Sequence, residues 1–377
     1  MSEKPLRIGV IGAGGRGHLS ENAQAPGVGG VITALCDTQP RVFSEYDAVC
    51  PPDTFKTADF RELLARPDVD AVFITAPDFL HEKIALAALE AGKAVYLEKP
   101  MAITTEGCDR ILDTAKRTGT PLYLGHNLRH FAFVRKMKEL IDAGAIGEVK
   151  AAWCRHFISY GGDAFFKDWH ADRAKSTSLL LQKASHDIDV MHWLCGAFTR
   201  RVVAQGALAV YGRITDRHPA TERGDATENS ANWPPLSQKG MNPVMDVEDV
   251  SHVLMTLGNG VLMTYQQCHF TPDPWRNHTI IGTEGRIENI DENRIAIWRT
   301  RGACRPEGDE VIDCRTLNYG EGGADRRTVA EFVRFVREGG ATLTSPLAAR
   351  EVVATGCAAT HSLRNGGIPV DIPEYAG

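Results

Sequence analysis

The sequence lacks any uninterrupted apolar stretch near the roughly 18 residues that indicate a membrane-spanning helix. Its N-terminal residues run almost directly into an expected strand and lack the apolar core of a signal peptide. No long run of Lys and Arg occurs, and the formal net charge is -6, whereas nucleic-acid binding depends on clustered basic residues. We therefore expect a cytoplasmic protein with neither a membrane nor a nucleic acid as partner.

Metal-ligand spacings are also missing. The 9 cysteines include no Cys-x-x-Cys pair, so neither a zinc site nor a thioredoxin-like motif is predicted. His126 and His130 have no ligand spacing with each other or with a carboxylate. We predict no bound metal, and free thiols in a reducing compartment.

Short apolar runs alternate with helical stretches through residues 1–125. The helices expected at 78–91 and 104–118 each stop at a Gly, which supplies a left-handed C-cap. Apolar runs bounded by turn residues are typical of strands buried on both faces. This alternation predicts a parallel sheet with right-handed crossovers. Its strands are expected at 6–11, 31–36, 69–75, 94–97 and 122–124.

The pattern changes after residue 150. Apolar runs then follow one another with turn residues between them and few helices, which predicts a largely antiparallel sheet. The polar segment 213–243 is expected to be a long loop, of a length often found in lids. Two helices should end the chain, one with Asp325 as N-cap and one with Pro346 at its first position. The strands are expected at 202–211, 247–257, 261–270, 279–281, 285–290 and 295–299.

The strongest motif is a glycine-rich stretch that fits Gly-x-Gly-x-x-Gly and follows an expected strand. The first glycine permits a tight turn, the second lets the backbone approach a pyrophosphate, and the third lets a helix pack on the strand. Asp37 stands 20 residues after Gly17, at the end of the second strand, where an acid accepts hydrogen bonds from the adenosine ribose. The cofactor-binding residues predicted from this motif are Gly12, Gly14, Gly15, Arg16, Gly17 and Asp37.

Asp37 also indicates which nucleotide binds. Its carboxylate would repel a 2′-phosphate, so we expect NAD rather than NADP. Arg41 could in principle hold such a phosphate, and we interpret it as a solvated helix residue.

The composition is that of an ordinary globular protein. Hydrophobic residues make up 43% and charged residues 24% of the 377 residues, and a chain of this length suggests two domains, possibly three. We expect a Rossmann dinucleotide-binding domain over 1–126 and a substrate-binding and oligomerisation domain over 127–377. The predicted fold class is α/β, with the Rossmann domain followed by an α+β domain whose large open sheet is mostly antiparallel.

Two further stretches carry a family resemblance. From Thr75 to Ala102 the chain reads TAPDFLHEKIALAALEAGKAVYLEKPMA, with a Thr-x-Pro turn, a His soon after, and then Glu-Lys-Pro. From Leu179 to Gly196 it reads LLLQKASHDIDVMHWLCG, with His-x-x-Asp at its centre. Together with the glycine motif, these stretches resemble the glucose–fructose oxidoreductase / inositol dehydrogenase (Gfo/Idh/MocA) family. The resemblance covers the whole chain and implies hydride transfer between nicotinamide and a sugar, sugar derivative or polyol.

The resemblance implies roles for residues at matching positions. Lys99 would exchange a proton with the reacting hydroxyl or carbonyl, His186 would contact the substrate beside it, and Asp189 would be a substrate-side partner. It also implies a cis peptide bond between Lys99 and Pro100. The residues implied to touch the cofactor or to line the nicotinamide pocket are Thr75, His81, Glu98, Lys99, Asn127 and Trp169.

The chemistry supports a lysine at this place. Oxidation of an alcohol requires a general base to accept the hydroxyl proton. A lysine serves only if its pKa falls from the usual value of about 10.4, which burial and a neighbouring cation both favour. Lys99 ends an expected buried strand at the carboxyl edge of the sheet, where open parallel sheets bind ligands. Lys183 is a candidate for the neighbouring cation.

His186 shares one helical face with other polar residues, although the helix is otherwise apolar. This pattern predicts a wetted site, with His186 as a second catalytic residue. Asp187 points about 100° away along the helix and is the weaker candidate. The predicted substrate contacts are Gln182, Lys183, Asp189, His170 and Trp169, with Arg173 and residues 275–277 as weaker candidates.

One position departs from the family. Its dehydrogenases usually carry Asp four residues before the active-site His, and this chain has Gln182 there. Gln forms hydrogen bonds but takes no proton. Two alternatives therefore stay open: an NAD-retaining lyase or glycosidase-like enzyme that oxidises its sugar transiently, and a non-catalytic sensor of nucleotide and sugar. Because an open sheet exposes one face, a homodimer or homotetramer through the C-terminal sheet is expected.

Overall fold

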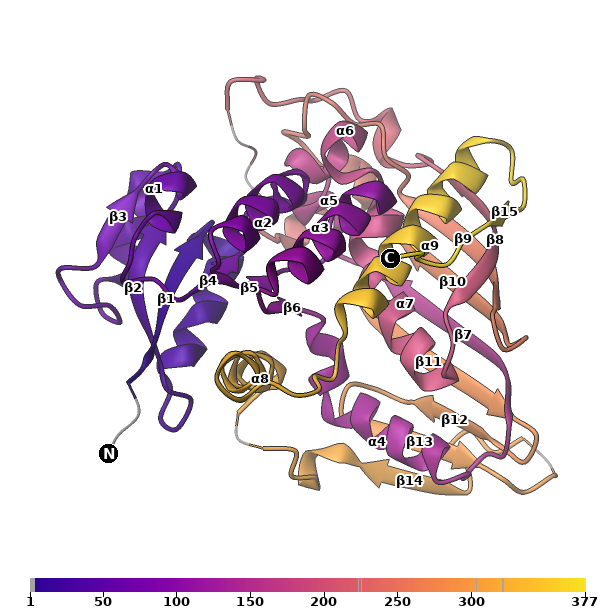
Figure 1. Ribbon diagram of the computed structural model, residues 1–377. Coiled ribbons are helices and arrows are strands. Elements are labelled where there is room, and N and C mark those ends of the chain that lie inside the picture. The colour runs from indigo at the N-terminus through magenta and orange to yellow at the C-terminus, as the bar shows by residue number, and fades with distance from the viewer. Residues whose placement is uncertain (1–3, 223, 225, 303, 321) are drawn as a thin grey trace. The chain divides into compact units, whose positions relative to one another are not determined.

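A computed structural model describes residues 4–222, 224, 226–302, 304–320 and 322–377 (Figure 1). The chain divides into two compact units. The first comprises Met1–His130, Tyr319–Arg350 and Tyr375–Gly377, and the second comprises Phe131–Asn318 and Glu351–Glu374. This differs from the division expected between residues 126 and 127, because the segment from 319 to 350 belongs to the first unit.

The sheet of the first unit is parallel throughout. Its strand order is β3-β2-β1-β4-β5-β6, which is the order of a Rossmann domain and confirms the predicted fold class. Every residue of β4 and β5 is buried, as expected for strands covered on both faces. The strands are β1 (Leu6–Ile11), β2 (Gly30–Cys36), β3 (Phe55–Thr57), β4 (Ala71–Ile74), β5 (Ala94–Leu97) and β6 (Leu122–Leu124).

The helices of this unit start and stop at recognisable signals. At the start of α3 the Thr104 side chain accepts a hydrogen bond from the backbone N–H of Gly107 (3.0 Å), and Gly119 ends α3 with φ of 67°. A 3-10 helix begins within the glycine motif, at Gly15. The helices are η1 (Gly15–Gln24), η2 (Pro40–Tyr46), α1 (Phe60–Leu64), η3 (Asp78–Leu80), α2 (His81–Glu90), α3 (Thr105–Thr118), η4 (Asn127–His130) and α8 (Ala324–Glu338).

Helix α8 explains why the chain returns to the first unit. Its apolar residues Val329, Phe332 and Val333 are buried in the same core as the strand residues Phe73 and Tyr96. Phe332 packs edge-on against both aromatic rings, with ring centroids 5.2 and 5.6 Å away. The Rossmann sheet therefore obtains part of its core from a helix that lies about 200 residues later in the sequence.

The start of α8 corrects one sequence prediction. The N-cap is Gly323, and Asp325 lies in the first turn of the helix. Its carboxylate instead accepts hydrogen bonds from Arg16 and Asn127, so this acid is used in a tertiary contact.

The second unit contains a sheet of nine strands in the order β14-β13-β12-β11-β7-β10-β9-β8-β15. Only β7 and β10 pair in parallel among these described strands, which confirms the mostly antiparallel sheet. Strands β7, β14 and β15 lie outside the predicted set. The bounds are β7 (Val149–Phe157), β8 (Thr199–Ala207), β9 (Val250–Leu257), β10 (Leu262–Cys268), β11 (Trp275–Gly282), β12 (Arg286–Asn289), β13 (Arg294–Trp298), β14 (Glu310–Asp313) and β15 (Val370–Asp371).

Helix α7 crosses the buried face of this sheet. Its N-cap is Ser178, whose hydroxyl accepts a hydrogen bond from the backbone N–H of Leu181 (2.9 Å), and Gly196 ends it with φ of 71°. None of the helices in the described ranges has the length and apolar composition to cross a membrane. The remaining helices are α4 (Ala132–Asp142), α5 (Gly161–Ala164), η5 (Trp169–Ala171), α6 (Arg173–Ser176), α7 (Leu179–Cys195), η6 (Tyr211–Arg213), η7 (Ser230–Asn232), η8 (Pro235–Ser237), η9 (Cys314–Thr316) and α9 (Pro346–Arg364).

The long connection between β8 and β9 contains the segment 213–243, expected to be a loop. Its described residues form short 3-10 helices, turns and an isolated β-bridge between Arg217 and Met241. Residues 223 and 225 lie outside the described part. The buried carboxylate of Asp163 holds this connection, because it accepts hydrogen bonds from the side chains of Asn232 and Gln238.

Candidate functional site

The glycine motif forms a turn that only glycine fits. Gly12 has φ of 85°, and a Cβ there would lie 2.5 Å from the backbone nitrogen of Ala76. A Cβ on Gly17 would lie 2.6 Å from the carbonyl oxygen of Gly12. The turn thus keeps the backbone open for close approach of a pyrophosphate, and these residues fit a dinucleotide.

Asp37 lies directly beside this turn. Its Oδ2 accepts a hydrogen bond from the backbone N–H of Gly14 (3.2 Å), and its Oδ1 accepts one from Gln39 (2.8 Å). These contacts hold the carboxylate at the end of β2, next to the loop that would carry the phosphates. The arrangement suits an acceptor for ribose hydroxyls.

The predicted cofactor residues converge at one edge of the first sheet. Gly12, Asp37, Thr75 and Glu98 are each the residue immediately after a strand, namely β1, β2, β4 and β5. Those four strands are neighbours in the sheet. The Thr75 hydroxyl donates to the carbonyl oxygen of Gly12 (2.8 Å), which ties two of these strand ends together. This is the carboxyl edge, where open α/β sheets bind their ligands.

The exposed Arg16 pairs with the buried Glu98. Arg16 Nε lies 2.7 Å from Glu98 Oε1, and Arg16 Nη1 lies 2.6 Å from Asp325 Oδ2. Although burial opposes it, these carboxylates raise the pKa of Arg16. The second oxygen of Glu98 accepts the backbone N–H of Lys99 (2.7 Å). Glu98 therefore joins the glycine turn to the segment that carries Lys99.

Lys99 lies half-buried after β5, and its peptide bond to Pro100 is cis, as the resemblance implies. His81 is buried, and its two ring nitrogens lie 2.7 Å from the Pro100 carbonyl oxygen and 2.8 Å from that of Ala76. Burial lowers the pKa of His81. Because both nitrogens face backbone carbonyls, His81 braces the Lys99 turn, and these contacts give no support to a direct cofactor contact.

The predicted substrate residues of the second unit lie mainly on α7. Gln182 and Asp189 are buried, whereas Lys183 and His186 are half-buried. Lys183 Nζ donates to the Tyr160 hydroxyl (3.2 Å). Asn127 belongs instead to the first unit, where its amide donates to Asp325 (2.8 Å).

Trp169 and His170 form a second polar group in this unit. Their rings stack with centroids 3.7 Å apart. The Asp168 carboxylate accepts hydrogen bonds from the backbone N–H of His170 (3.0 Å) and from its Nδ1 (2.5 Å). The imidazole is thereby fixed in one orientation.

Asp187, the weaker candidate in the sequence, has polar side chains on several sides. Asp187 is completely buried. Arg276 Nε lies 3.2 Å from its Oδ1, and His156 Nδ1 lies 3.0 Å from its Oδ2. His278 Nε2 and the Tyr265 hydroxyl each lie 3.2 Å from it. Although burial opposes ionisation, Arg276 and the histidines hold the pKa of Asp187 well below its usual range.

The pairing of the strands explains this cluster. His156 of β7 pairs with Arg276 of β11, and Cys154 of β7 pairs with His278 of β11. All four point to the face under α7, because buried residues alternate along β7. In the sequence, these residues could have been found as polar residues at the inward positions of a strand. That pattern requires β7 to be predicted as a strand first, and β7 was not predicted.

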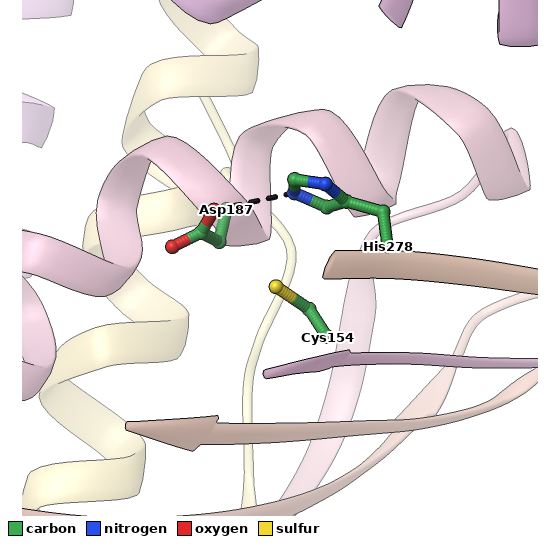
Figure 2. A group of neighbouring side chains, drawn as sticks. All are labelled: Cys154, Asp187 and His278. Atoms are coloured by element: carbon green, nitrogen blue, oxygen red, sulfur yellow. Dashed lines mark hydrogen bonds and ion pairs between the residues drawn. The ribbon is translucent and has the colours of Figure 1, made fainter. Parts of the chain in front are cut away.

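Cys154, Asp187 and His278 place three metal-binding atom types within 4.8 Å of one another (Figure 2). The carboxylate, however, is already surrounded by hydrogen-bond donors, one of which is the Arg276 guanidinium at 3.2 Å. A cation at this place would face that positive charge. We therefore interpret the group as part of a hydrogen-bonded network that fixes α7 to the sheet.

The network predicts a pH-dependent stability. Burial and Arg276 lower the pKa of His156 from 6.5 to about 4. Between these values the unfolded chain binds more protons than the folded one, so the free energy of unfolding should fall as pH falls. The loss attributable to His156 should reach about 3 kcal/mol at pH 4.

Urea unfolding of the wild type and of His156→Asn between pH 4 and 7 measures this loss. The variant should show a flatter pH profile, and His252→Asn, which changes an exposed histidine of the same sheet, should keep the wild-type profile. Parallel profiles for wild type and His156→Asn would refute the assignment.

Comparison with known proteins agrees with this geometry. The family model described as "Oxidoreductase family, NAD-binding Rossmann fold" matches residues 6–126. The model described as "Oxidoreductase family, C-terminal alpha/beta domain" matches residues 138–372. The expected NAD-binding Rossmann domain is thereby confirmed.

Named relatives include an inositol 2-dehydrogenase of Burkholderia multivorans, 33% identical over 223 residues, which are 58% of this chain and 61% of that protein. A levoglucosan dehydrogenase of Pseudarthrobacter phenanthrenivorans is 27% identical over 319 residues, or 77% and 76% of the two chains. The match to the inositol dehydrogenase thus spans less than two thirds of its length.

Solved structures share the fold. A levoglucosan dehydrogenase in complex with NADH and L-sorbose superposes with a TM-score of 0.79 at 22% identity, over 99% of this chain and 100% of that one. Together with the two family models, the turn at Gly12 and the strand-end residues around it establish the classification. The chain belongs to the Gfo/Idh/MocA family of oxidoreductases.

Proposed function

We propose that this oxidoreductase transfers a hydride between NAD and a sugar, sugar derivative or polyol, with Lys99 as general acid and base. The observation that carries the proposal is the placement of Lys99. It follows β5 at the same sheet edge as the Gly12 turn and is braced there by Glu98 and His81. The names of the relatives, inositol and levoglucosan dehydrogenases, support the substrate class.

The residues of the first unit would bind and orient the nucleotide. Gly12, Gly14, Gly15 and Gly17 would leave room for the pyrophosphate, and Asp37 would accept the ribose hydroxyls. When bound, the nicotinamide supplies the hydride acceptor. The remaining predicted cofactor contacts in this unit are Arg16, Thr75, His81, Glu98 and Asn127.

The chain's own part in the chemistry is the movement of one proton. As the carbinol carbon loses hydride, the Lys99 amine would accept the hydroxyl proton, and in the reverse direction the ammonium would return it. The Glu98 carboxylate is directed to Arg16 and to a backbone N–H, so it holds the turn without taking that proton. The substrate would be oriented by His186 together with Gln182, Lys183, Asp189, His170 and Trp169.

Incubation with NAD and a panel of hexoses, inositols and anhydrosugars tests the proposal. NADH absorbance should rise with at least one of them and remain flat without a substrate. If sugars are converted while NADH absorbance stays flat, an enzyme that retains its NAD through the reaction is favoured instead.

That alternative is an NAD-retaining lyase or glycosidase-like enzyme, and Gln182 is the observation that favours it. Replacing Gln182 by Asp would introduce the carboxylate usual in the family's dehydrogenases four residues before His186. For a dehydrogenase we expect Gln182→Asp to keep or raise NADH formation, with NAD affinity unchanged. Steady-state rates measure NADH formation, and titration with NAD measures the affinity. Loss of native activity with intact NAD binding would favour the NAD-retaining enzyme.

The choice between NAD and NADP depends on Asp37. Because its carboxylate would repel a 2′-phosphate, NAD should bind more tightly than NADP, by roughly tenfold or more. Asp37→Ser should reduce that ratio, mainly by improving NADP binding. Fluorescence titration of the wild type and of Asp37→Ser with NADH and with NADPH measures these affinities. Tighter binding of NADPH than NADH to the wild type would contradict the assignment.

We also propose a cytoplasmic location and a homodimer or homotetramer formed through the open sheet of the second unit. The exposed hydrophobic residues Trp153, Leu254 and Leu262 lie on the neighbouring strands β7, β9 and β10, and Thr264 pairs with both Trp153 and Leu254. They thus form a contiguous apolar surface of the kind that subunit contacts cover.

A further inference from the structure

One buried carboxylate holds the long connection between β8 and β9 against the rest of its unit. We call residues 226–242 of this connection the strap. Asp163 of α5 is 4% exposed. It accepts hydrogen bonds from the side chains of Asn232 and Gln238 and from the backbone N–H of Asn229 (3.4 Å). Three residues of the strap thus converge on a single carboxylate.

The strap also contacts the backbone and the apolar side chains of the segment 158–171. The backbone N–H of Asn242 donates to the carbonyl oxygen of Phe166 (2.8 Å). Met241 of the strap is fully buried in one apolar core with Ile158 and Phe166. The position of this segment therefore depends on the strap that packs against it.

The same segment carries or contacts three of the proposed substrate residues. Trp169 and His170 belong to it, and the Phe165 ring packs edge-on against His170, with ring centroids 5.1 Å apart. Lys183 Nζ lies 4.6 Å from the centroid of the Phe165 ring and 3.2 Å from the Tyr160 hydroxyl. A shift of the segment would therefore displace these three side chains together.

The chemistry of Asp163 explains how it holds the strap. Its described partners are all hydrogen-bond donors, and they include the Lys167 ammonium at 3.3 Å. Hydrogen bonds to a charged group are about twice as strong as those between neutral groups. An amide at this position would carry no charge and would turn an N–H toward one of these donors. The contact between the strap and α5 therefore requires the carboxylate.

We propose that Asp163 is a positioning residue that sets the affinity of the enzyme for its sugar, because it seats the strap on the segment 158–171. The inference rests on the proposed function, since Trp169, His170 and Lys183 are the proposed sugar contacts that this segment orients. Only molecules with a seated strap bind the sugar well, so the apparent affinity falls with their fraction. The strap is seated once the sugar is bound, and the chemical step then proceeds at its usual rate.

The substitution Asp163→Asn in the full chain tests the inference. It should raise the KM for the sugar about tenfold, because losing hydrogen bonds to a charged group lowers the seated fraction by about one decade. The kcat and the affinity for NADH should stay close to the wild-type values. Steady-state rates with NAD and glucose, myo-inositol or 1,6-anhydroglucose measure KM and kcat, and fluorescence titration measures NADH affinity. Calorimetry of the NADH-loaded protein with the same three sugars measures their affinity without turnover.

Two further variants keep the test decisive if Asp163→Asn folds poorly. Asn232→Ala removes one contact of the strap and leaves the buried carboxylate intact, so it should raise KM by a smaller factor. Trypsin should cleave both variants after the exposed Lys239 of the strap faster than it cleaves the wild type. Glu351→Gln alters another buried carboxylate of the same unit, which pairs with Arg200, and should leave KM unchanged.

The outcomes separate this inference from the proposed function. Sugar affinity equal to that of the wild type in Asp163→Asn and Asn232→Ala would overturn the inference, even if the strap is cleaved faster. An equal rise of KM in Glu351→Gln would overturn it too, because any loss of stability would then have the same effect. If the wild type binds a sugar but forms no NADH, the proposed reaction is contradicted, and the affinities of the variants still decide the inference. If the wild type binds none of the three sugars, the inference is overturned together with the proposed substrate class.

Discussion

Replacing Lys99 by Ala should lower kcat about 10²–10⁴-fold, which is the usual contribution of a positioned proton-transfer group. The affinity for NAD should barely change, because the Gly12 turn and Asp37 are intact in the variant. Steady-state rates and NADH titration measure the two quantities. The matched variant Lys116→Ala, at an exposed position on α3, should retain wild-type kcat.

The His186→Ala variant separates proton transfer from substrate positioning. We expect a lower kcat with a larger rise in KM than in Lys99→Ala, because His186 is proposed to orient the sugar. If Lys99→Ala were fully active, the mechanism proposed for this residue would be refuted, whatever the other variant does.

Replacing Asp187 by Ala should destabilise the protein by about 3–5 kcal/mol, because removal of one partner leaves a buried charge uncompensated. That charge is Arg276, which is partly buried and whose Nε lies 3.2 Å from Asp187 Oδ1. Urea unfolding followed by circular dichroism measures the change.

A matched carboxylate controls for the loss of charge alone. Asp371 pairs with Arg201 on the exposed edge of the same sheet, at 2.7 Å. Asp371→Ala should leave the unfolding midpoint nearly unchanged, since exposed ion pairs contribute little. Similar midpoints for the Asp187 and Asp371 variants would show that the buried network does not stabilise the unit.

The nucleotide half of the fold could be predicted because its signals are local. Strand β1 with its glycine turn, the Gly119 cap of α3, and the buried runs of β4 and β5 each depend on a few adjacent residues. The strand ends that carry Asp37, Thr75 and Glu98 then follow from parallel pairing, because parallel strands bring their carboxyl ends to one edge.

Two features escaped prediction because they depend on distant contacts. Helix α8 has an apolar face that any core could bury, and nothing local indicates that Phe332 packs against Phe73 and Tyr96. Asp325 resembled an N-cap residue, but its carboxylate is taken by Arg16. A local capping signal was thus overridden by a tertiary ion pair.

The Asp187 cluster shows a similar limit. On a helical wheel, Asp187 points away from His186 and was the weaker candidate for that reason. In the structure that side of α7 faces the sheet. There β7, β10 and β11 contribute His156, Tyr265 and Arg276, which all contact Asp187. Without the register of β7 against β11, no spacing in the sequence indicates that these residues meet.

Transfer of deuterium from substrate to nucleotide tests the central claim most directly. A panel substrate labelled at its carbinol carbon is incubated with excess NAD, and the NADH released is analysed by mass spectrometry. A dehydrogenase should release one deuterated NADH for each substrate oxidised, and Lys99→Ala should show the same transfer at a rate about 10²–10⁴-fold lower. Full conversion of the substrate with no deuterium in the released nucleotide would contradict the account.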